Sequence, residues 1–138
     1  MVGIVIATHG TLADGLMDAV NLIIGEQEDV FTLGLKHGDD ISEFGEHLVA
    51  GIEKVDHGEG VIVFTDLFGA SPYNQAAMAK RKLDGIPYQL ITGVNLPMLI
   101  QAFNDRILGL GLDEMKASSF KAGTDGVVDF FAKFANKQ

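Results

Sequence analysis

The chain has 138 residues, of which 47% are hydrophobic and 21% charged, so it can bury one sizeable core and is too apolar for an intrinsically disordered protein. It has no cysteine, which excludes disulfide frameworks, thiolate nucleophiles and sulfur-ligated zinc sites. Its net charge of −9, from 10 Lys and Arg against 19 Asp and Glu, disfavours binding to a nucleic-acid backbone.

The apolar segments and the N-terminus of the chain indicate its cellular location. None reaches the roughly 18 residues of a membrane span, so direct membrane insertion is not expected. The N-terminus has neither the basic start nor the cleavage site of a signal peptide. We therefore predict a cytoplasmic chain whose residues 1–138 form one domain.

The first predicted unit is a strand, a tight turn and a helix. Residues 2–8 form a continuous apolar run rich in β-branched residues, as expected for a strand covered on both faces. The run ends at His9 and Gly10, and Thr11 then begins the spacing of a helix cap. Apolar residues at helical spacing continue until Gly25 can end the helix.

The second and third units repeat this pattern. A strand from about Val30 to Leu35 is followed by a polar turn, a cap at Asp40 and a second amphipathic helix. A third strand, residues 60–65, leads into a loop of small residues. Ser71 is a predicted N-cap because the proline after it suits the first helical position, and the helix is expected to reach about Leu83.

The last third of the chain is less regular. A fourth strand is predicted at about 87–92, followed by turn residues and a helix that reaches Ile107. Residues 108–120 fit neither element, because glycines interrupt the helical periodicity while the run stays apolar. The i, i+3, i+4, i+7 spacing of apolar residues between Val127 and Phe134 predicts an amphipathic C-terminal helix.

Four strand-then-helix units predict an α/β fold, a three-layer α/β/α sandwich with a mainly parallel four-stranded sheet. In such open sheets, ligand sites form beyond the carboxyl ends of the strands, near a switch in strand order. His9 and Asp66 both follow predicted strands directly. They are therefore the first candidates for a functional site.

His9 is predicted to emerge beside a helix N-terminus, where unpaired N–H groups favour an anion. Gly10 leaves room for another group to approach the imidazole closely. The alternative is a histidine that packs into or caps its own turn, which is the commoner role at a strand end. Thr8 and Gly10 flank His9, and this context favours a nucleophilic imidazole.

Asp66 also has two candidate roles. It can satisfy N–H groups of its own loop, as Asp commonly does in turns. It can instead accept the Nδ1–H of a histidine, which holds the tautomer that leaves Nε2 free as a nucleophile. Together with His9 at a neighbouring strand end, the second role predicts nucleophilic catalysis.

Backbone donors surround these two side chains. Ser71 is explained as a helix cap, yet with Gly69 and Ala70 the same helix start could present N–H groups to phosphate oxygens. We therefore name Gly10, Gly69, Ala70 and Ser71 as candidate phosphate-binding residues.

The other polar residues indicate no metal and no cofactor. His37, His47 and His57 lie in polar or charged stretches and are predicted to be solvated. No His, Asp or Glu cluster has metal-ligand spacing, and no glycine-rich nucleotide motif follows a strand.

Three stretches together resemble a known family: residues 7–10 (ATHG), 66–74 (DLFGASPYN) and 93–99 (GVNLPML). In this order and spacing they are similar to the enzyme IIA component of the mannose family in the bacterial phosphoenolpyruvate-dependent sugar phosphotransferase system (PTS). Ala70 and Tyr73 stand where many relatives have Gly and Phe.

The resemblance implies a phosphotransferase component that carries a phosphoryl group on Nε2 of His9. The group would come from the histidine-containing phosphocarrier protein (HPr) and pass to the IIB component, which works with the membrane components IIC and IID in sugar uptake. Asp66 would hydrogen-bond the His9 ring, and the Ser71 region would contact the phosphoryl oxygens.

The resemblance also implies a homodimer whose subunits exchange a fifth, antiparallel strand. Residues 108–120 and the far C-terminus are the two candidates for that strand. Because the chain stops after the IIA domain, we expect IIB to be a separate polypeptide.

Two other functions fit the same fold. In a receiver-like domain Asp66 itself would take the phosphoryl group, but that chemistry needs Mg²⁺ and further carboxylates near the end of the first strand. A flavodoxin-like regulatory module would bind an anion reversibly, without covalent modification.

Overall fold

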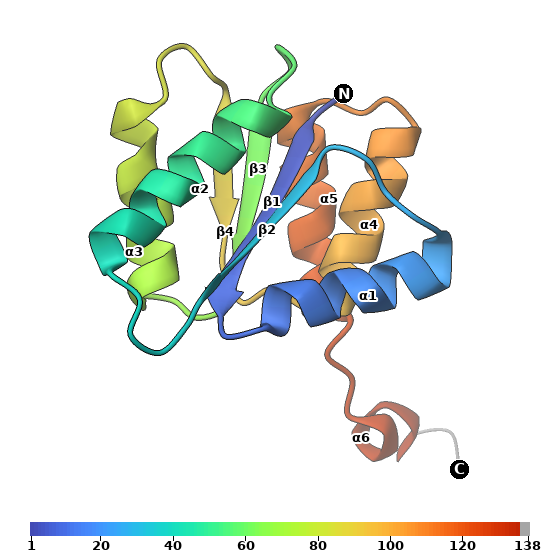
Figure 1. Cartoon of the computed structure of the whole chain (residues 1–138). Helices are drawn as coiled ribbons and strands as arrows, with labels where there is room; N and C mark the ends of the chain where they lie inside the picture. The colour runs from blue at the N-terminus through green and yellow to red at the C-terminus, as the bar shows by residue number, and fades with distance from the viewer. Residues whose placement is uncertain (136–138) are drawn as a thin grey trace.

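The computed structural model describes residues 1–135, which fold into a four-stranded parallel sheet between two layers of helices (Figure 1). The elements in chain order are β1 (Gly3–His9), α1 (Leu12–Ile24), β2 (Val30–Leu35), α2 (Ile41–Val55), β3 (Val61–Thr65), α3 (Ser71–Ala79), a 3₁₀ turn (Lys80–Lys82), β4 (Tyr88–Ile91), α4 (Leu96–Ile107), α5 (Leu112–Asp125) and α6 (Phe130–Phe134). The predicted α/β sandwich is confirmed. None of these helices is long and apolar enough to cross a membrane.

The strand order is β2-β1-β3-β4, and every neighbouring pair is parallel. The chain moves from β1 to β2 on one side and then crosses to β3 on the other side of β1. The carboxyl ends of β1 and β3 therefore flank the switch in strand order, where open α/β sheets place their sites. Ala7 lies opposite Thr65 in this register, so His9 and Asp66 follow on neighbouring strands.

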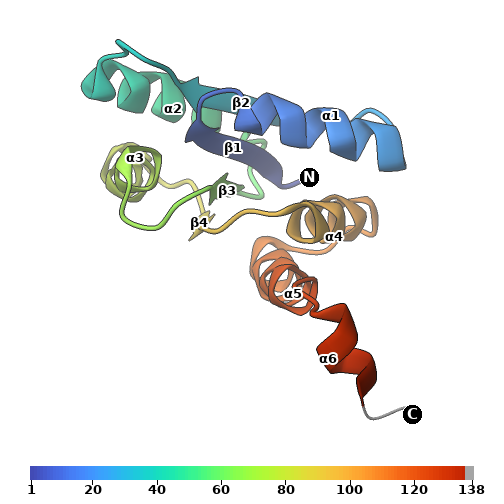
Figure 2. The same cartoon turned by 90° about the horizontal axis from the view of Figure 1, so that it is seen from below.

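Alternate residues of β1 contribute to two separate cores. Ile4 and Ile6 belong to the core covered by α1, α4 and α5, whereas Val5 and Ala7 belong to the core covered by α2 and α3. Figure 2 shows these helices on opposite sides of the sheet, with α5 packed against α4. Because both faces of the sheet are covered, the central strands are continuous apolar runs rather than alternating ones.

The segment of ambiguous pattern, residues 108–120, is a turn followed by most of α5. Gly109, with φ of 77°, follows the last turn of α4, and Gly111 is the N-cap of α5. The glycines therefore separate two helices rather than interrupt one. The third helix is also shorter than predicted, since α3 ends at Ala79 and only a 3₁₀ turn continues toward Leu83.

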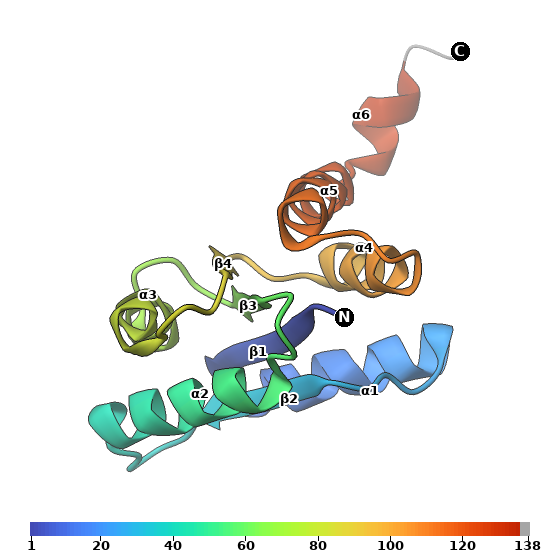
Figure 3. The ribbon, with the colours of Figure 1, turned by 90° about the horizontal axis from the view of Figure 1, so that it is seen from above.

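The C-terminal segment contains a short helix that lies apart from the sheet. Only residues 130–134 are helical, so the helix starts later than predicted and Val127 lies outside it. Figure 3 shows α6 projecting away from the sheet beyond α5. Neither residues 108–120 nor the C-terminal residues up to 135 form a strand, and the rest of the far C-terminus, residues 136–138, lies outside the described residues. The exchange of a fifth strand between two subunits stays a prediction.

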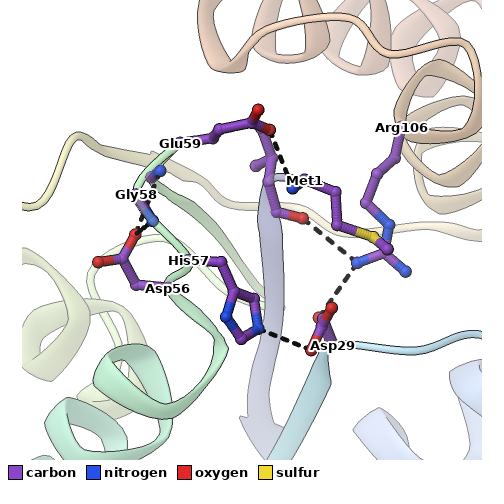
Figure 4. Close-up of polar contacts among 9 residues, drawn as sticks. Met1, Asp29, Asp56, His57, Gly58, Glu59 and Arg106 are labelled. Carbon is purple, nitrogen blue, oxygen red and sulfur yellow. Dashed lines mark hydrogen bonds and ion pairs between the residues drawn. The ribbon is translucent and has the colours of Figure 1, made fainter.

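A buried arginine joins three segments at the amino edge of the sheet, opposite to His9 (Figure 4). Arg106 is 7% exposed, and its Nη1 donates to the carbonyl oxygens of Val2 and Asp29 at 3.3 and 3.1 Å. Its Nη2 donates to the carbonyl oxygen of Glu28. The guanidinium carbon also lies 5.1 Å from the centre of the Phe103 ring. One side chain of α4 thus holds the start of β1 and the loop before β2.

Asp29 is held from a second direction. Its backbone is in the left-handed region, with φ of 51°, and its Oδ1 lies 2.9 Å from Nε2 of His57. His37, His47 and His57 are exposed, as predicted. The ion pair of His57, however, joins the loop after α2 to the loop before β2, which the sequence pattern did not indicate.

We expect Arg106→Met to destabilise the fold by about 2–3 kcal/mol, because one buried and two partly buried carbonyl groups lose a charged donor. Urea unfolding measures this difference. The control is Arg81→Met on the exposed 3₁₀ turn, which should change the free energy of unfolding by less than about 0.5 kcal/mol. Equal stability of the two variants would show that the Arg106 contacts contribute nothing net.

Candidate functional site

The structure brings His9 and Asp66 into direct contact. Nδ1 of the His9 ring lies 2.9 Å from Oδ2 of Asp66, and the backbone N–H of His9 donates to the same oxygen at 3.0 Å. One carboxylate oxygen therefore fixes both the main chain and the ring of His9. The register of β1 and β3 sets this contact, because the two residues leave neighbouring strands at the same edge.

The two side chains differ in exposure. The His9 side chain is 47% exposed and that of Asp66 is 14% exposed. Burial raises the pKa of Asp66, but the hydrogen bonds from the His9 backbone and ring outweigh it and hold that pKa below its ordinary value of 3.8. Asp66 is therefore ionised near neutral pH and can only accept. Nδ1 therefore carries the proton of the neutral ring, which leaves Nε2 with a free lone pair on the accessible side.

The turn after His9 depends on a glycine in the neighbouring strand. Gly10 has φ of 56° and its N–H donates to the carbonyl oxygen of Leu35 at 2.8 Å. A Cβ atom at Gly34 would lie 2.0 Å from the carbonyl oxygen of Gly10. Only glycine fits at position 34 without moving the His9 turn, a requirement that no local pattern in β2 indicated.

Thr8, rather than Thr11, supplies the capping hydroxyl of α1. Thr11 occupies the N-cap position, but its backbone is not extended and its side chain makes no cap hydrogen bond. Instead the buried Oγ1 of Thr8 accepts the N–H of Ala13 at 2.9 Å and donates to the carbonyl oxygen of His9 at 3.1 Å. The predicted cap position is therefore confirmed, but the capping hydroxyl is that of Thr8, which ties the helix start to the His9 turn.

The candidate phosphate-binding loop follows Asp66 directly. Gly69 has φ of 79°, and Ala70, with an extended backbone, is the N-cap of α3. Ser71 is therefore the first helical residue, and the prediction that it is the N-cap was wrong. The N–H groups of this first turn have no intrahelical acceptors and lie at the same sheet edge as His9. The roles of Gly10, Gly69, Ala70 and Ser71 toward a phosphoryl group stay predictions.

The third motif of the sequence, residues 93–99, has a structural role beside this site. Asn95 caps α4 by accepting the N–H of Met98 at 3.0 Å, and its Nδ2 donates to the carbonyl oxygen of Gly123 at 3.0 Å. The N–H of Val94 donates to the carbonyl oxygen of Thr65 at 3.0 Å. The motif thus fastens α5 to α4 and secures the end of β3 next to Asp66.

The arrangement favours His9 over Asp66 as the group that is modified. Asp66 is mostly buried and already engaged by His9, whereas the His9 ring is accessible. Within residues 1–135 no group of three or more His, Cys, Asp and Glu residues could hold a metal ion. The additional carboxylates that a receiver-like magnesium site needs are therefore not assembled around Asp66.

Comparisons with known proteins agree on one family. The family EIIA-man, described as the PTS system fructose IIA component, matches residues 3–120. Over 136 residues, 99% of this chain, the sequence is 33% identical to the PTS system mannose-specific EIIAB component of Escherichia coli K12. It is 26% identical over 109 residues to the PTS system fructose-specific EIIA component of Bacillus subtilis, with 77% of this chain and 71% of the relative covered.

A solved structure gives the same result. The crystal structure of the phosphotransferase system component EIIA from Streptococcus agalactiae has a TM-score of 0.88 at 26% identity, with 96% of this chain and 99% of that chain covered. The mannose-specific relative is a longer protein, and this chain spans 42% of its length.

Proposed function

The chain belongs to the EIIA-man family of PTS components, and on that premise we propose that His9 carries a phosphoryl group between two proteins of a sugar-uptake system. HPr is the donor and the IIB component is the acceptor, and IIB works with the membrane components IIC and IID. The observation that carries this proposal is the contact of an accessible imidazole with a mostly buried carboxylate, 2.9 Å apart, at the switch point of the sheet.

The proposed step is an in-line transfer between two imidazoles. Nε2 of His9 attacks the phosphorus of the donor's phosphohistidine, so one N–P bond breaks as another forms. The proton on Nδ1 stays in the hydrogen bond to Asp66, whose negative charge stabilises the cationic ring. Since the bonds made and broken are of one kind, the transfer is nearly isoenergetic and runs onward to IIB in the same way.

The surface around His9 is suited to protein partners. Leu12, Leu67 and Phe68 follow closely after His9 and Asp66 in the chain, and all three side chains are exposed, with Phe68 at 75%. Exposed apolar groups around a reactive residue are typical of a docking surface. A partner that covers them removes water from the N–P bond during transfer.

The direct test is phosphorylation by phosphoenolpyruvate with the general PTS proteins, enzyme I and HPr. Mass spectrometry should find one phosphoryl group on the chain, located at His9. The label should be lost in acid and survive base, as phosphohistidine does, whereas an acyl phosphate on Asp66 is lost in base and to hydroxylamine. An unmodified chain would instead support the reversible anion-binding module.

We also propose that the chain forms a homodimer. Val127, Val128, Phe130 and Phe131 are all exposed in the segment that projects from α5. An apolar groove lies beside β4, one of the two edge strands, and its lining includes Leu90, Ile91 and Phe120. We infer that the C-terminal segment of one subunit covers this groove in the other subunit, which buries both apolar surfaces.

Sedimentation of wild-type chain and variants tests the dimer. We expect a wild-type dimer and a monomeric Phe131→Asp variant at micromolar concentration, because a charge enters the proposed apolar contact. Leu22→Asp, at an equally exposed position on α1, should leave the dimer intact. A monomeric wild type, or a dimeric Phe131→Asp, contradicts the proposal.

A further inference from the structure

Asn74 ends the second motif, residues 66–74, and the proposed transfer assigns it no part. It lies in the first turn of α3, and its side chain is exposed. Its Nδ2 donates to the carbonyl oxygen of Gly69 at 3.0 Å, and its backbone N–H donates to the carbonyl oxygen of Ala70 at 2.9 Å. One residue therefore holds two consecutive carbonyl groups of the loop.

These two bonds decide the direction of the loop peptides. The peptide bonds are trans, so the N–H of each peptide points away from its carbonyl oxygen. Because Asn74 draws the carbonyls of Gly69 and Ala70 toward α3, the N–H groups of Ala70 and Ser71 point away from the helix. The Ala70 N–H makes only a long turn hydrogen bond, 3.3 Å, to Leu67. Consecutive N–H groups of this kind form an anion-binding concavity.

The backbone needs this restraint. Gly69, with φ of 79°, has the conformational freedom of glycine, and the Ala70 carbonyl is already fixed by the helix. The peptide between Gly69 and Ala70 has its carbonyl held by the Asn74 side chain. If that peptide turned over, a carbonyl oxygen would replace an N–H group at the loop mouth and would repel a phosphoryl oxygen.

We propose that Asn74 is a positioning residue for phosphoryl transfer, which keeps the loop from Gly69 to Ser71 in the orientation that presents N–H groups to the phosphoryl oxygens. The inference rests on the proposed function of His9. Asn74 touches no reacting atom and acts through the loop.

The test compares Asn74→Ala and Asn74→Asp with the wild-type chain. Neither variant can donate to Gly69, and the aspartate adds repulsion of the same carbonyl. Single-turnover transfer from HPr, phosphorylated by enzyme I and phosphoenolpyruvate, should slow about tenfold in Asn74→Ala and further in Asn74→Asp. The ³¹P chemical shift of phosphorylated His9 should move in both variants, whereas the label at completion should still be on His9.

The control is Asn104→Ala, an exposed asparagine on α4 far along the helix from the site, which should transfer at the wild-type rate. Unfolding in urea separates positioning from simple destabilisation, because a purely structural Asn74 would lower stability without moving the ³¹P shift. Wild-type rates and shifts in both Asn74 variants overturn this inference alone. A wild-type chain that accepts no phosphoryl group overturns the proposed function and the inference together.

Discussion

We expect the His9→Ala variant to accept no phosphoryl group from phosphorylated HPr. The change removes the imidazole that the structure places in contact with Asp66 at the switch point of the sheet, and Asp66 is too buried and engaged to replace it. The variant should still fold, because the His9 ring is half exposed and the backbone N–H that bonds Asp66 remains. Intact-protein mass spectrometry with the complete phosphorylation mixture measures the loss.

His57→Ala is the matched control for this experiment. His57 also pairs with a carboxylate at 2.9 Å, that of Asp29, but at the opposite edge of the sheet. An imidazole–carboxylate pair alone therefore does not define the site, and this variant should be labelled like the wild type. Labelling of His9→Ala would falsify the assignment of His9 and move the phosphoryl group to another residue.

The second large effect concerns Asp66→Asn, which should fold and transfer the phosphoryl group about 10²–10⁴ times more slowly. An amide oxygen in the place of Oδ2 can still accept both the backbone N–H and the Nδ1–H of His9, so the tautomer should be kept. Transfer slows because the cationic ring loses the negative charge beside it. Rapid-quench kinetics gives the rate, and ¹⁵N chemical shifts of the His9 ring give the tautomer.

The pH dependence of stability provides an independent measurement on the same pair. Because the pKa of Asp66 is depressed in the folded state, its carboxylate stabilises the fold above the ordinary value of 3.8. This contribution is lost as the pH falls through the lower, folded pKa. The wild-type chain should therefore lose more stability between pH 5 and strong acid, on the order of pH 2, than Asp66→Asn does. Identical acid profiles and identical transfer rates would contradict the role of Asp66.

Much of the fold and the central pair could be predicted because they depend on strong local patterns. Continuous apolar runs marked the strands, and their order along the chain predicted which residues would leave the sheet at its carboxyl edge. Position alone brought His9 and Asp66 together as candidates. The structure places them in hydrogen-bond contact because β1 and β3 are direct neighbours.

Features that depend on distant parts of the chain could not be predicted in this way. Thr11 has the spacing of a cap, but the hydroxyl that reaches the first turn comes from Thr8, inside the preceding strand. A glycine inside a strand, such as Gly34, usually weakens that strand. Here it is required because a Cβ atom would collide with the carbonyl oxygen of Gly10, in the turn after β1. The acceptors of Arg106 lie 77 to 104 residues away, beyond any periodicity of α4.

The carboxyl edge of the sheet holds the His9–Asp66 pair, whereas the amino edge holds the contacts of Arg106. Arg106 clamps the chain where the strands begin, a full strand length away from the imidazole. Stability at the amino edge and the candidate site at the carboxyl edge therefore depend on separate residues, so substitutions that strengthen the contacts of Arg106 should raise the melting temperature without changing the His9–Asp66 contact.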